Sequence, residues 1–244
     1  MRADAHYVDE LESRRRPAET TSPTLAFPTS IPVTFALRDM SQELEGVVSC
    51  FNLVAAKARP LRERLGLSLA RVGVQRNMRA FQALRALLED PPAEPRPVSL
   101  NMIVEQTVTS FDEELHVTES RAALDLHDGP IRVNADARMV SIAVQGCMGT
   151  MIALMEASAE GGAIHVATRV ADGIACCEFR QDTYRMAAYQ FGRLADLEWS
   201  GRPGGIPAGI ALAAAARIAQ AHGGSLDARR LESGGCALAL NLRA

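Results

Sequence analysis

The sequence predicts an α+β protein in which a helical hairpin precedes an α/β sandwich. Two runs between Phe35 and Glu89 repeat apolar residues at the three-and-four spacing of an amphipathic helix. From Pro97 onward, helical runs alternate with short β-rich segments and glycine turns. We therefore expect a mobile tail over residues 1–34, a hairpin over 35–92 and an α/β domain over 97–244.

Composition narrows the class of protein. The 244 residues are 48% hydrophobic, enough for a sizeable core. A net charge of −3 gives no electrostatic case for binding nucleic acid or an anionic membrane. No apolar run approaches the roughly 20 residues that span a bilayer, and the N-terminus lacks a signal-peptide apolar region. The five cysteines show no metal-ligand spacing. We expect a cytoplasmic protein with free thiols and no bound metal.

The first helix is expected over Phe35–Arg59 and the second over Leu67–Glu89, with Pro60 and Gly66 interrupting the pattern between them. The second helix carries an apolar stripe of Val74, Met78, Phe81, Leu84 and Leu88. Two helices alone cannot cover such a stripe. Pairing two copies into a four-helix bundle would bury it, which favours a homodimer.

The α/β half is expected to contain three helices packed on one mixed sheet. The first two helices are expected over Pro97–Leu115 and over Asp136–Glu156, where Asp136 is the cap. The third is expected after Gly204, where a glycine-rich run leads into a helix. A further short helix is expected over Ala187–Leu197. Its expected strands are Ala122–Leu126, Ile131–Asn134, Ala163–Arg169, Ile174–Phe179, Ser225–Arg230 and Cys236–Leu242. Gly223 and Gly224 should stop the last helix, and Ser233-Gly-Gly235 should turn the closing hairpin.

The order of a glycine-rich helix entry, His222-Gly-Gly and a closing hairpin resembles the end of the ATP-binding domain of sensor histidine kinases. Met40-Ser-Gln-Glu-Leu resembles the phosphoacceptor box of that family, Val98-Ser-Leu its entry to the first ATPase helix, and Asn134-Ala-Asp-Ala-Arg-Met the start of its nucleotide-contacting helix. Bacterial histidine phosphotransferases have a similar architecture, in which the same helical bundle precedes a degenerate ATPase domain. The resemblance implies a dimeric four-helix bundle followed by a histidine-kinase-type ATPase α/β sandwich, in two-component signalling.

The chain departs from the family at the phosphoacceptor. Gln42 stands where the resemblance places the histidine, and a carboxamide is not a nucleophile at cellular pH. No histidine occurs in either predicted hairpin helix. His222 matches the His-Gly-Gly turn, for which we expect a structural role. Phosphorylation at the usual position is therefore not expected.

The nucleotide boxes also depart from the family pattern. Gln145 and Gly149 fall where the resemblance places two asparagines, and Gly149 has no side-chain oxygen for magnesium. Gly146 and Gly149 are more simply interpreted as close-packing positions. Asp182 matches the family's adenine-binding aspartate, but Tyr184 and Met186 replace the glycines that follow it. Gly205 and Gly209 remain in the second glycine box with Pro207 between them, which removes a backbone N–H from a phosphate cradle.

These departures predict a catalytically inactive relative of the family that dimerises and docks a response-regulator receiver domain or a partner kinase, without a cofactor. The docking residues would be Gln42, Glu45, Ser49 and Asn52, and the vestigial nucleotide pocket would comprise Gln145, Gly149, Asp182, Gly205 and Gly209. Two alternatives remain open: an ATP-binding protein or kinase with residual nucleotide-dependent activity, and a structural oligomerising subunit of a larger regulatory complex.

Overall fold

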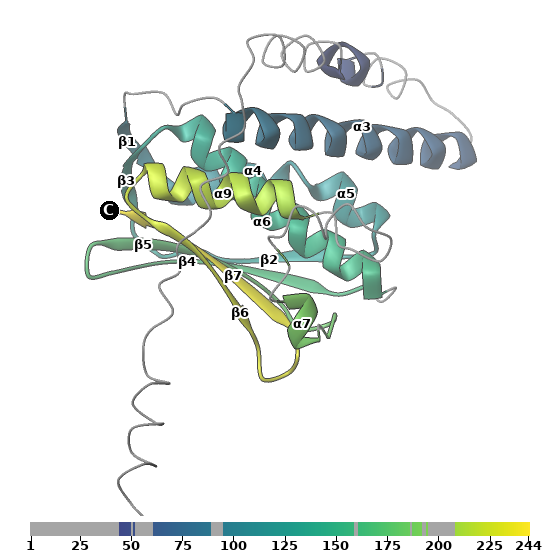
Figure 1. Cartoon of the computed structure of the whole chain (residues 1–244). Helices are drawn as coiled ribbons and strands as arrows, with labels where there is room; N and C mark the ends of the chain where they lie inside the picture. Colours follow the sequence, from purple (N-terminus) through teal and green to yellow (C-terminus); the bar gives the residue numbers. More distant parts are fainter. Residues whose placement is uncertain are drawn as a thin grey trace, which may run out of the picture.

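The computed structural model describes residues 44–49, 51, 61–88, 95–158, 161–185, 187–191, 194 and 208–244. Within them one long helix, α3 (Leu61–Leu88), lies across a layer of helices that covers one face of a β-sheet (Figure 1). The predicted tail and most of the first hairpin helix lie outside the described residues, although 44–49 and 51 are helical. The two-helix hairpin and its four-helix bundle therefore stay predictions.

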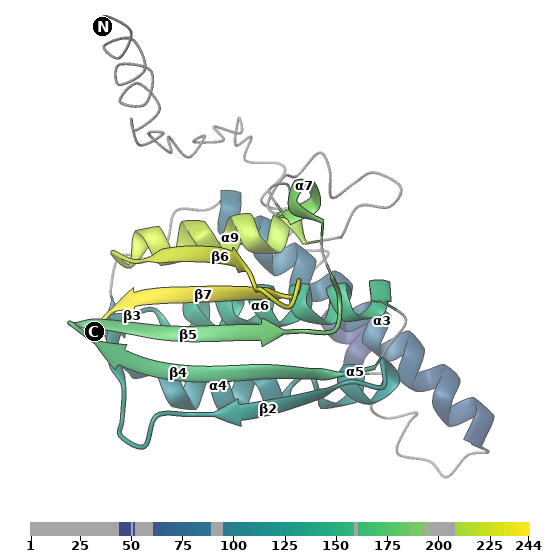
Figure 2. The ribbon, with the colours of Figure 1, turned by 90° about the horizontal axis from the view of Figure 1, so that it is seen from below.

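The main sheet is mixed, as predicted, and has five strands rather than the six expected. Its strands run in the order β2 (Arg121–Asp125), β4 (Ala163–Ala171), β5 (Ile174–Gln181), β7 (Cys236–Arg243) and β6 (Ser225–Arg230). β2 and β4 are parallel, and every other neighbouring pair is antiparallel. Seen from below, the sheet turns toward the viewer the face that the described helices leave uncovered, and those helices lie behind it (Figure 2).

A second sheet, which the sequence did not predict, pairs β1 (Arg96–Ser99) with β3 (Arg132–Ala135) in antiparallel register. Pro97 lies opposite Asn134, and a two-stranded sheet tolerates this proline because it has no central strand. The segment was expected to begin a helix. Its helix instead begins at Leu100, where the Ser99 hydroxyl accepts a hydrogen bond from the Met102 amide at 3.4 Å.

The helix expected over Pro97–Leu115 is two helices, α4 (Leu100–Thr109) and α5 (Asp112–Val117). The Ser110 hydroxyl donates to the Thr107 carbonyl at 2.6 Å and closes the last turn of α4. Phe111 then turns its ring into the core, where it is fully buried. A short polar segment and a buried aromatic residue thus divide a run that has an almost continuous helical period.

Helix α6 (Ala137–Ser158) is the centre of the core. Asp136 caps it as predicted, because its carboxylate accepts hydrogen bonds from the amides of Arg138 (2.8 Å) and Met139 (3.1 Å). With 22 residues and a mean hydropathy of 1.4, α6 has the length and composition of a membrane span, contrary to the expectation that no apolar run approaches that length. However, 72% of the 18-residue apolar stretch of α6 that has this mean hydropathy is buried inside the fold, which is typical of a core helix.

Helix α9 (Gly209–Ala221) ends in the two hydrogen bonds of a Schellman motif. The Gly224 amide donates to the Ala219 carbonyl (2.8 Å), and the Gly223 amide donates to the Gln220 carbonyl (3.0 Å). Gly223 has a φ of +70°, in the left-handed region that favours glycine. The predicted end of the helix at Gly223 and Gly224 is confirmed, and β6 begins at the next residue.

Helix α3 begins at Leu61 and runs through Gly66, so the expected interruption at Gly66 is wrong. A glycine inside a helix costs only about 1 kcal/mol relative to alanine, and packing of α3 against α9, α6 and α5 offsets that cost. Ala83 and Ala86 are buried in the hydrophobic core, and Val72 is buried as well. The predicted stripe of Val74, Met78, Phe81, Leu84 and Leu88 is half-buried, and Leu65 and Leu69 are exposed.

The thiols give a direct test of the core. Burial raises the pKa of Cys147 and of Cys236 to about 12 and raises that of Cys177 well above its ordinary value. Because a thiolate is the reactive species, iodoacetamide at pH 8 should leave these three cysteines unmodified in the folded protein and modify them in urea. Mass mapping of the alkylated peptides measures this. Rapid native labelling of Cys177 would contradict the described core.

Candidate functional site between α3 and α6

A cavity of about 260 Å³ lies between α3, α5, α6 and α9. Helix α3 contributes Arg76, Asn77, Arg79, Ala80 and Ala83, α5 contributes Glu114, and α9 contributes Ala211; from α6 come Ile142, Gln145, Gly146, Gly149, Thr150, Ala153 and Glu156. Gln145 and Gly149, two members of the predicted vestigial pocket, are thus brought together. Helix α3, which was predicted as the second helix of a hairpin, forms one wall of the cavity.

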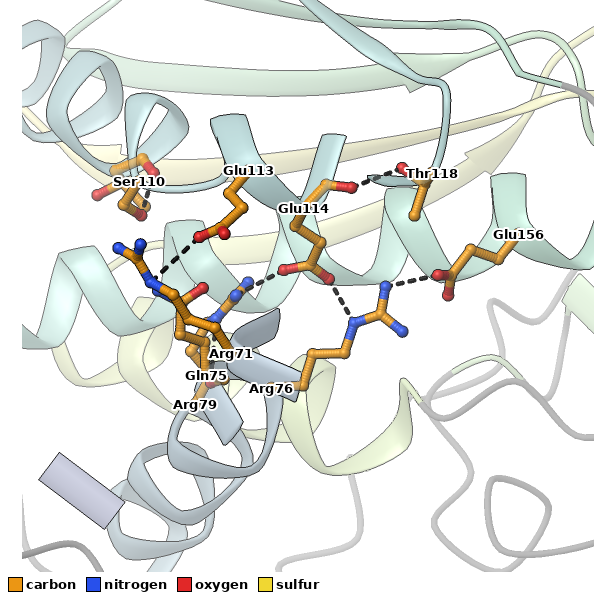
Figure 3. A network of polar contacts seen from close by, with 10 residues as sticks. Arg71, Gln75, Arg76, Arg79, Ser110, Glu113, Glu114, Thr118 and Glu156 are labelled. Carbon is orange, nitrogen blue, oxygen red and sulfur yellow. Dashed lines mark hydrogen bonds and ion pairs between the residues drawn. The ribbon is translucent and has the colours of Figure 1, made fainter. Parts of the chain in front are cut away.

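A cluster of ion pairs fastens α3 beside this cavity (Figure 3). Arg76 Nε lies 2.6 Å from Glu114 Oε1, and Arg76 Nη2 lies 2.6 Å from Glu156 Oε1. Arg79 Nη2 lies 2.5 Å from Glu114 Oε2, and its guanidinium stacks 3.9 Å from the centre of the Phe111 ring. We call Arg76, Arg79, Glu114 and Glu156 the arginine clasp.

Burial makes the clasp sensitive to the loss of one partner, because a buried charge that is left without its counterion is costly. The Glu114 side chain is only 3% exposed and the Arg79 side chain 17%. Desolvation lowers the pKa of Arg79 even though Glu114 opposes it. For Arg76 desolvation also lowers the pKa, but hydrogen bonds and charge from Glu156 and Glu114 outweigh it and leave the pKa raised. Both arginines stay protonated, so the clasp holds two cations and two anions and is formally neutral.

The two α6 glycines differ in what surrounds them. A Cβ on Gly146 would lie 2.8 Å from the Ala211 carbonyl oxygen, so close packing against α9 requires glycine there, as predicted. A Cβ on Gly149 would meet nothing within 4 Å, so the close-packing interpretation is wrong for this residue. Gly149 instead leaves open space in the cavity. Beside it, Gln145 Nε2 donates to the Ser141 hydroxyl (3.3 Å), whereas Gln145 Oε1 is buried without a partner among the described residues.

Asp182 is not brought to this cavity. It lines a hollow on the uncovered face of the sheet, with His165, Arg169 and Arg180 among its neighbours. Partial desolvation raises the pKa of Asp182, but hydrogen bonds from Ser233 (2.8 Å) and Arg180 (3.0 Å) outweigh it, so the pKa lies below its ordinary value. Asp182 therefore lines a different hollow from the one that Gln145 and Gly149 line.

The buried residue at the end of β5 is Gln181, which the sequence reading missed. It continues the alternation of Cys177 and Phe179 on the covered face of the sheet. Its amide oxygen accepts from the Tyr184 amide (2.8 Å), and its amide nitrogen donates to the Tyr184 carbonyl (3.2 Å). Both ends of the Gln181 amide are thereby hydrogen-bonded to the backbone of Tyr184, which fixes the turn after β5. The period of two along this strand was the signal that identifies it.

The second glycine box is described only in part. Gly209 is the buried first residue of α9, and Ala211, two residues on, lines the cavity. Gly205 and Pro207 lie outside the described residues. Helix α7 (Ala188–Phe191) covers only the beginning of the helix expected over Ala187–Leu197, and most of the remaining positions there are also not described.

His222 has a structural position, as expected. Its Nε2 accepts a hydrogen bond from the Asp136 amide (3.1 Å), and its Nδ1 lies 2.8 Å from the Ile218 carbonyl, to which it donates. The neutral imidazole with hydrogen on Nδ1 satisfies both contacts. His222 therefore ties the start of α6 to the end of α9.

We expect His222→Ala to lower the free energy of unfolding by about 2 kcal/mol, because two hydrogen bonds are lost and the Asp136 amide loses its acceptor. Urea denaturation followed by circular dichroism measures the change. His127→Ala is the matched control. His127 is an exposed loop residue whose ring, among the described residues, bonds only to Gly129, and the substitution leaves its backbone bonds to Thr168 and Asn101 in place. Equal losses in the two variants would contradict the assigned role.

Of the predicted docking residues, Glu45 and Ser49 are described and exposed one turn apart on the same helix. The Ser49 hydroxyl donates to the Glu45 carbonyl at 2.9 Å. Gln42 and Asn52 lie outside the described residues. The arginine clasp, by contrast, was not anticipated, because its members are separated by up to 80 residues.

The residues of the cavity do not fit magnesium and a triphosphate. Both lining carboxylates, Glu114 and Glu156, are already paired with arginine, and Gly149 supplies no side-chain oxygen. Among the described residues, no group of three histidine, cysteine or acidic side chains is arranged to hold a metal. The lining arginines are likewise committed to the clasp rather than free for phosphate.

The chain has the fold of histidine kinase catalytic domains. The nucleotide-free catalytic domain of histidine kinase ThkA matches with a TM-score of 0.52 and 14% identity over 62% of this chain and 96% of its own. The mycobacterial sensor histidine kinase MprB matches with a TM-score of 0.50 and 17% identity, over 61% and 97% of the two chains. Full-length ShkA in complex with AMPPNP matches with a TM-score of 0.57 and 16% identity, over 86% of this chain and 45% of its own.

No protein-family model and no curated protein matches the sequence. The likeness to solved structures thus rests on the arrangement of elements. The chemistry of the site depends on its own residues, chiefly Gln145, Gly149, Gln181 and the clasp.

Proposed function

We propose that this chain is a histidine-kinase-like signalling module that dimerises and docks a receiver domain or a partner kinase without passing phosphate through the usual position. The observation that carries the proposal is the cavity beside Gln145 and Gly149. Its carboxylates and arginines neutralise one another, and α3 packs across it. A chain with such a cavity keeps the histidine-kinase fold but lacks the free charged groups needed to hold Mg-ATP.

The dimer part of the proposal rests on α3. Its buried face is used within the chain, yet the stripe from Val74 to Leu88 remains half-buried, and Leu65 and Leu69 are exposed. A second copy that packs along this stripe would remove that apolar surface from water. Light scattering coupled to size exclusion should give twice the monomer mass of 26.2 kDa. A monomer at micromolar concentration would contradict this part.

The docking part rests on the exposed helix face of Glu45 and Ser49. We expect at least one receiver domain from a panel to bind saturably in a calorimetric titration. Glu45→Arg and Ser49→Arg should weaken that binding at least about tenfold, since each places a long cation inside the contact. Glu232→Arg is the control, because it makes the same charge change at an exposed turn between β6 and β7. Absence of saturable binding, or equal weakening by the control, would count against docking.

A further inference from the structure

Side chains on the uncovered face of the main sheet form rows across the strands, because residues paired in register point to the same side. From β2 to β6, one row consists of Ala123, His165, Arg180, Ala237 and Arg229. The neighbouring row on the same face consists of Asp125, Ala167, Glu178, Ala239 and Asp227. Apart from alanine, the first row holds only basic residues and the second only acidic ones. We call them the basic row and the acidic row.

The charges of both rows are partly paired within the chain. Arg229 lies 2.5 Å from Glu178, and Arg180 lies 3.0 Å from Asp182, at the end of β5. The four side chains are between 31% and 61% exposed, so water screens these pairs and each contributes little to stability. Such pairs exchange partners at low cost when a second charged surface approaches.

The alanines leave space between the charged side chains. Ala167 and Ala239 are half-exposed, whereas Ala237 is buried within the chain. A hollow of about 330 Å³ is lined by Ala123 and Ala167, and the exposed His165 lies beside it. Large side chains that alternate with small ones allow two sheet faces to interdigitate.

A two-fold axis that lies between the rows and runs along them makes this face complementary to itself. Under this axis each row of one copy faces the other row of the second copy, with like strands opposite each other. Arg180 then faces Glu178, and Arg229 faces Asp227, so opposite charges meet. β5 is the middle strand of the five, which places its pair near the centre, where two twisted sheets are best aligned.

We propose that the uncovered face of the sheet is a contact surface for a second copy of this chain, related by a two-fold axis between the basic and acidic rows. In this contact His165 of one copy enters the space above Ala167 of the other. The face lies on the opposite side of the sandwich from α3 (Figure 1). The contact therefore goes beyond the dimer proposed above, and either can fail while the other stands. Alanine supplies little apolar area, so the association is weak, with a dissociation constant above about 10 µM.

Sedimentation equilibrium of the full chain tests the contact. The weight-average mass should rise with concentration, from whichever mass the chain has when dilute. Glu178→Arg and Arg180→Glu should each raise the dissociation constant of this step at least about tenfold, since like charges then face each other. Glu105→Arg is the control, because it makes the same charge change as Glu178→Arg at an exposed position of α4, in the helix layer. It should keep the rise in mass.

An equimolar mixture of the Glu178→Arg and Arg180→Glu chains separates a contact between copies from an effect within one chain. Across the axis the two changes place opposite charges against each other at both symmetric positions. The mixture should therefore associate within about threefold of the wild-type dissociation constant, although neither variant associates with itself. If one variant does not fold, Asp227→Arg mixed with Arg229→Asp gives the same test at the outer pair.

Three results would each overturn the contact. The first is a wild-type mass that does not rise with concentration. The second is a rise that Glu178→Arg leaves intact or that Glu105→Arg also abolishes. The third is a mixture of folded variants that associates no better than either variant alone. None of these results bears on the α3 dimer, whose mass is read from the dilute sample.

Discussion

Glu114→Gln should lower the free energy of unfolding by about 3 kcal/mol, because it removes the anion that two arginines share in a buried site. Arg79 is only 17% exposed and would lose its ion-pair partner. Arg76 is 39% exposed and keeps Glu156, so it would recover part of its hydration. Urea denaturation of the full chain measures the loss, which should appear in the transition that includes α3.

The exposed ion pair of Asp125 and Arg169 provides the control. Their side chains are 78% and 72% exposed, so Asp125→Asn should change stability by less than about 0.5 kcal/mol. Replacing both Glu114 and Arg79 by methionine should recover much of the stability lost in Glu114→Gln, since apolar side chains can replace a buried pair. A loss no larger for Glu114→Gln than for Asp125→Asn would show that the clasp does not hold α3.

Gly224→Ala should prevent the closing hairpin from docking and cost at least about 3 kcal/mol. The added Cβ would lie 1.9 Å from the Asn241 carbonyl oxygen, which belongs to the backbone of β7 and cannot move alone. β7 pairs with both β5 and β6, so the displacement would spread through the sheet. Soluble expression and thermal unfolding by circular dichroism test the expectation.

Gly73→Ala makes the same chemical change where nothing lies within 4 Å of the added atom. It should stabilise α3 by up to about 1 kcal/mol, because alanine is the better helix former. The two substitutions should therefore have opposite signs. A Gly224→Ala protein as stable as wild type would mean that α9, β6 and β7 do not meet as described.

Local chemistry made much of the α/β half predictable. Asp136 as a cap, Gly223 and Gly224 as a helix stop, and alternating strands each follow from a few neighbouring residues. The division of α4 from α5 was missed because Phe111 keeps the helical period while its side chain enters the core. β1 was missed because its pairing with β3 joins residues more than thirty positions apart.

The site was less predictable than the fold. Gln145 and Gly149 share a cavity because both lie on α6 four residues apart, a spacing visible in the sequence. Asp182 was assigned by its motif, whereas the alternation of β5 places Gln181 on the covered face instead. The clasp joins α3 to α5 and α6 through tertiary packing alone. No local sequence pattern predicts which of the many arginines and glutamates form ion pairs.

Titration of the full chain with ATP in the presence and absence of magnesium is the most direct test of the central claim. The account predicts no saturable heat up to millimolar nucleotide, because the cavity beside Gln145 and Gly149 is neutral and lacks a free carboxylate. Micromolar binding that requires magnesium and disappears in Gly149→Leu would contradict it and restore the nucleotide-dependent enzyme as the better account.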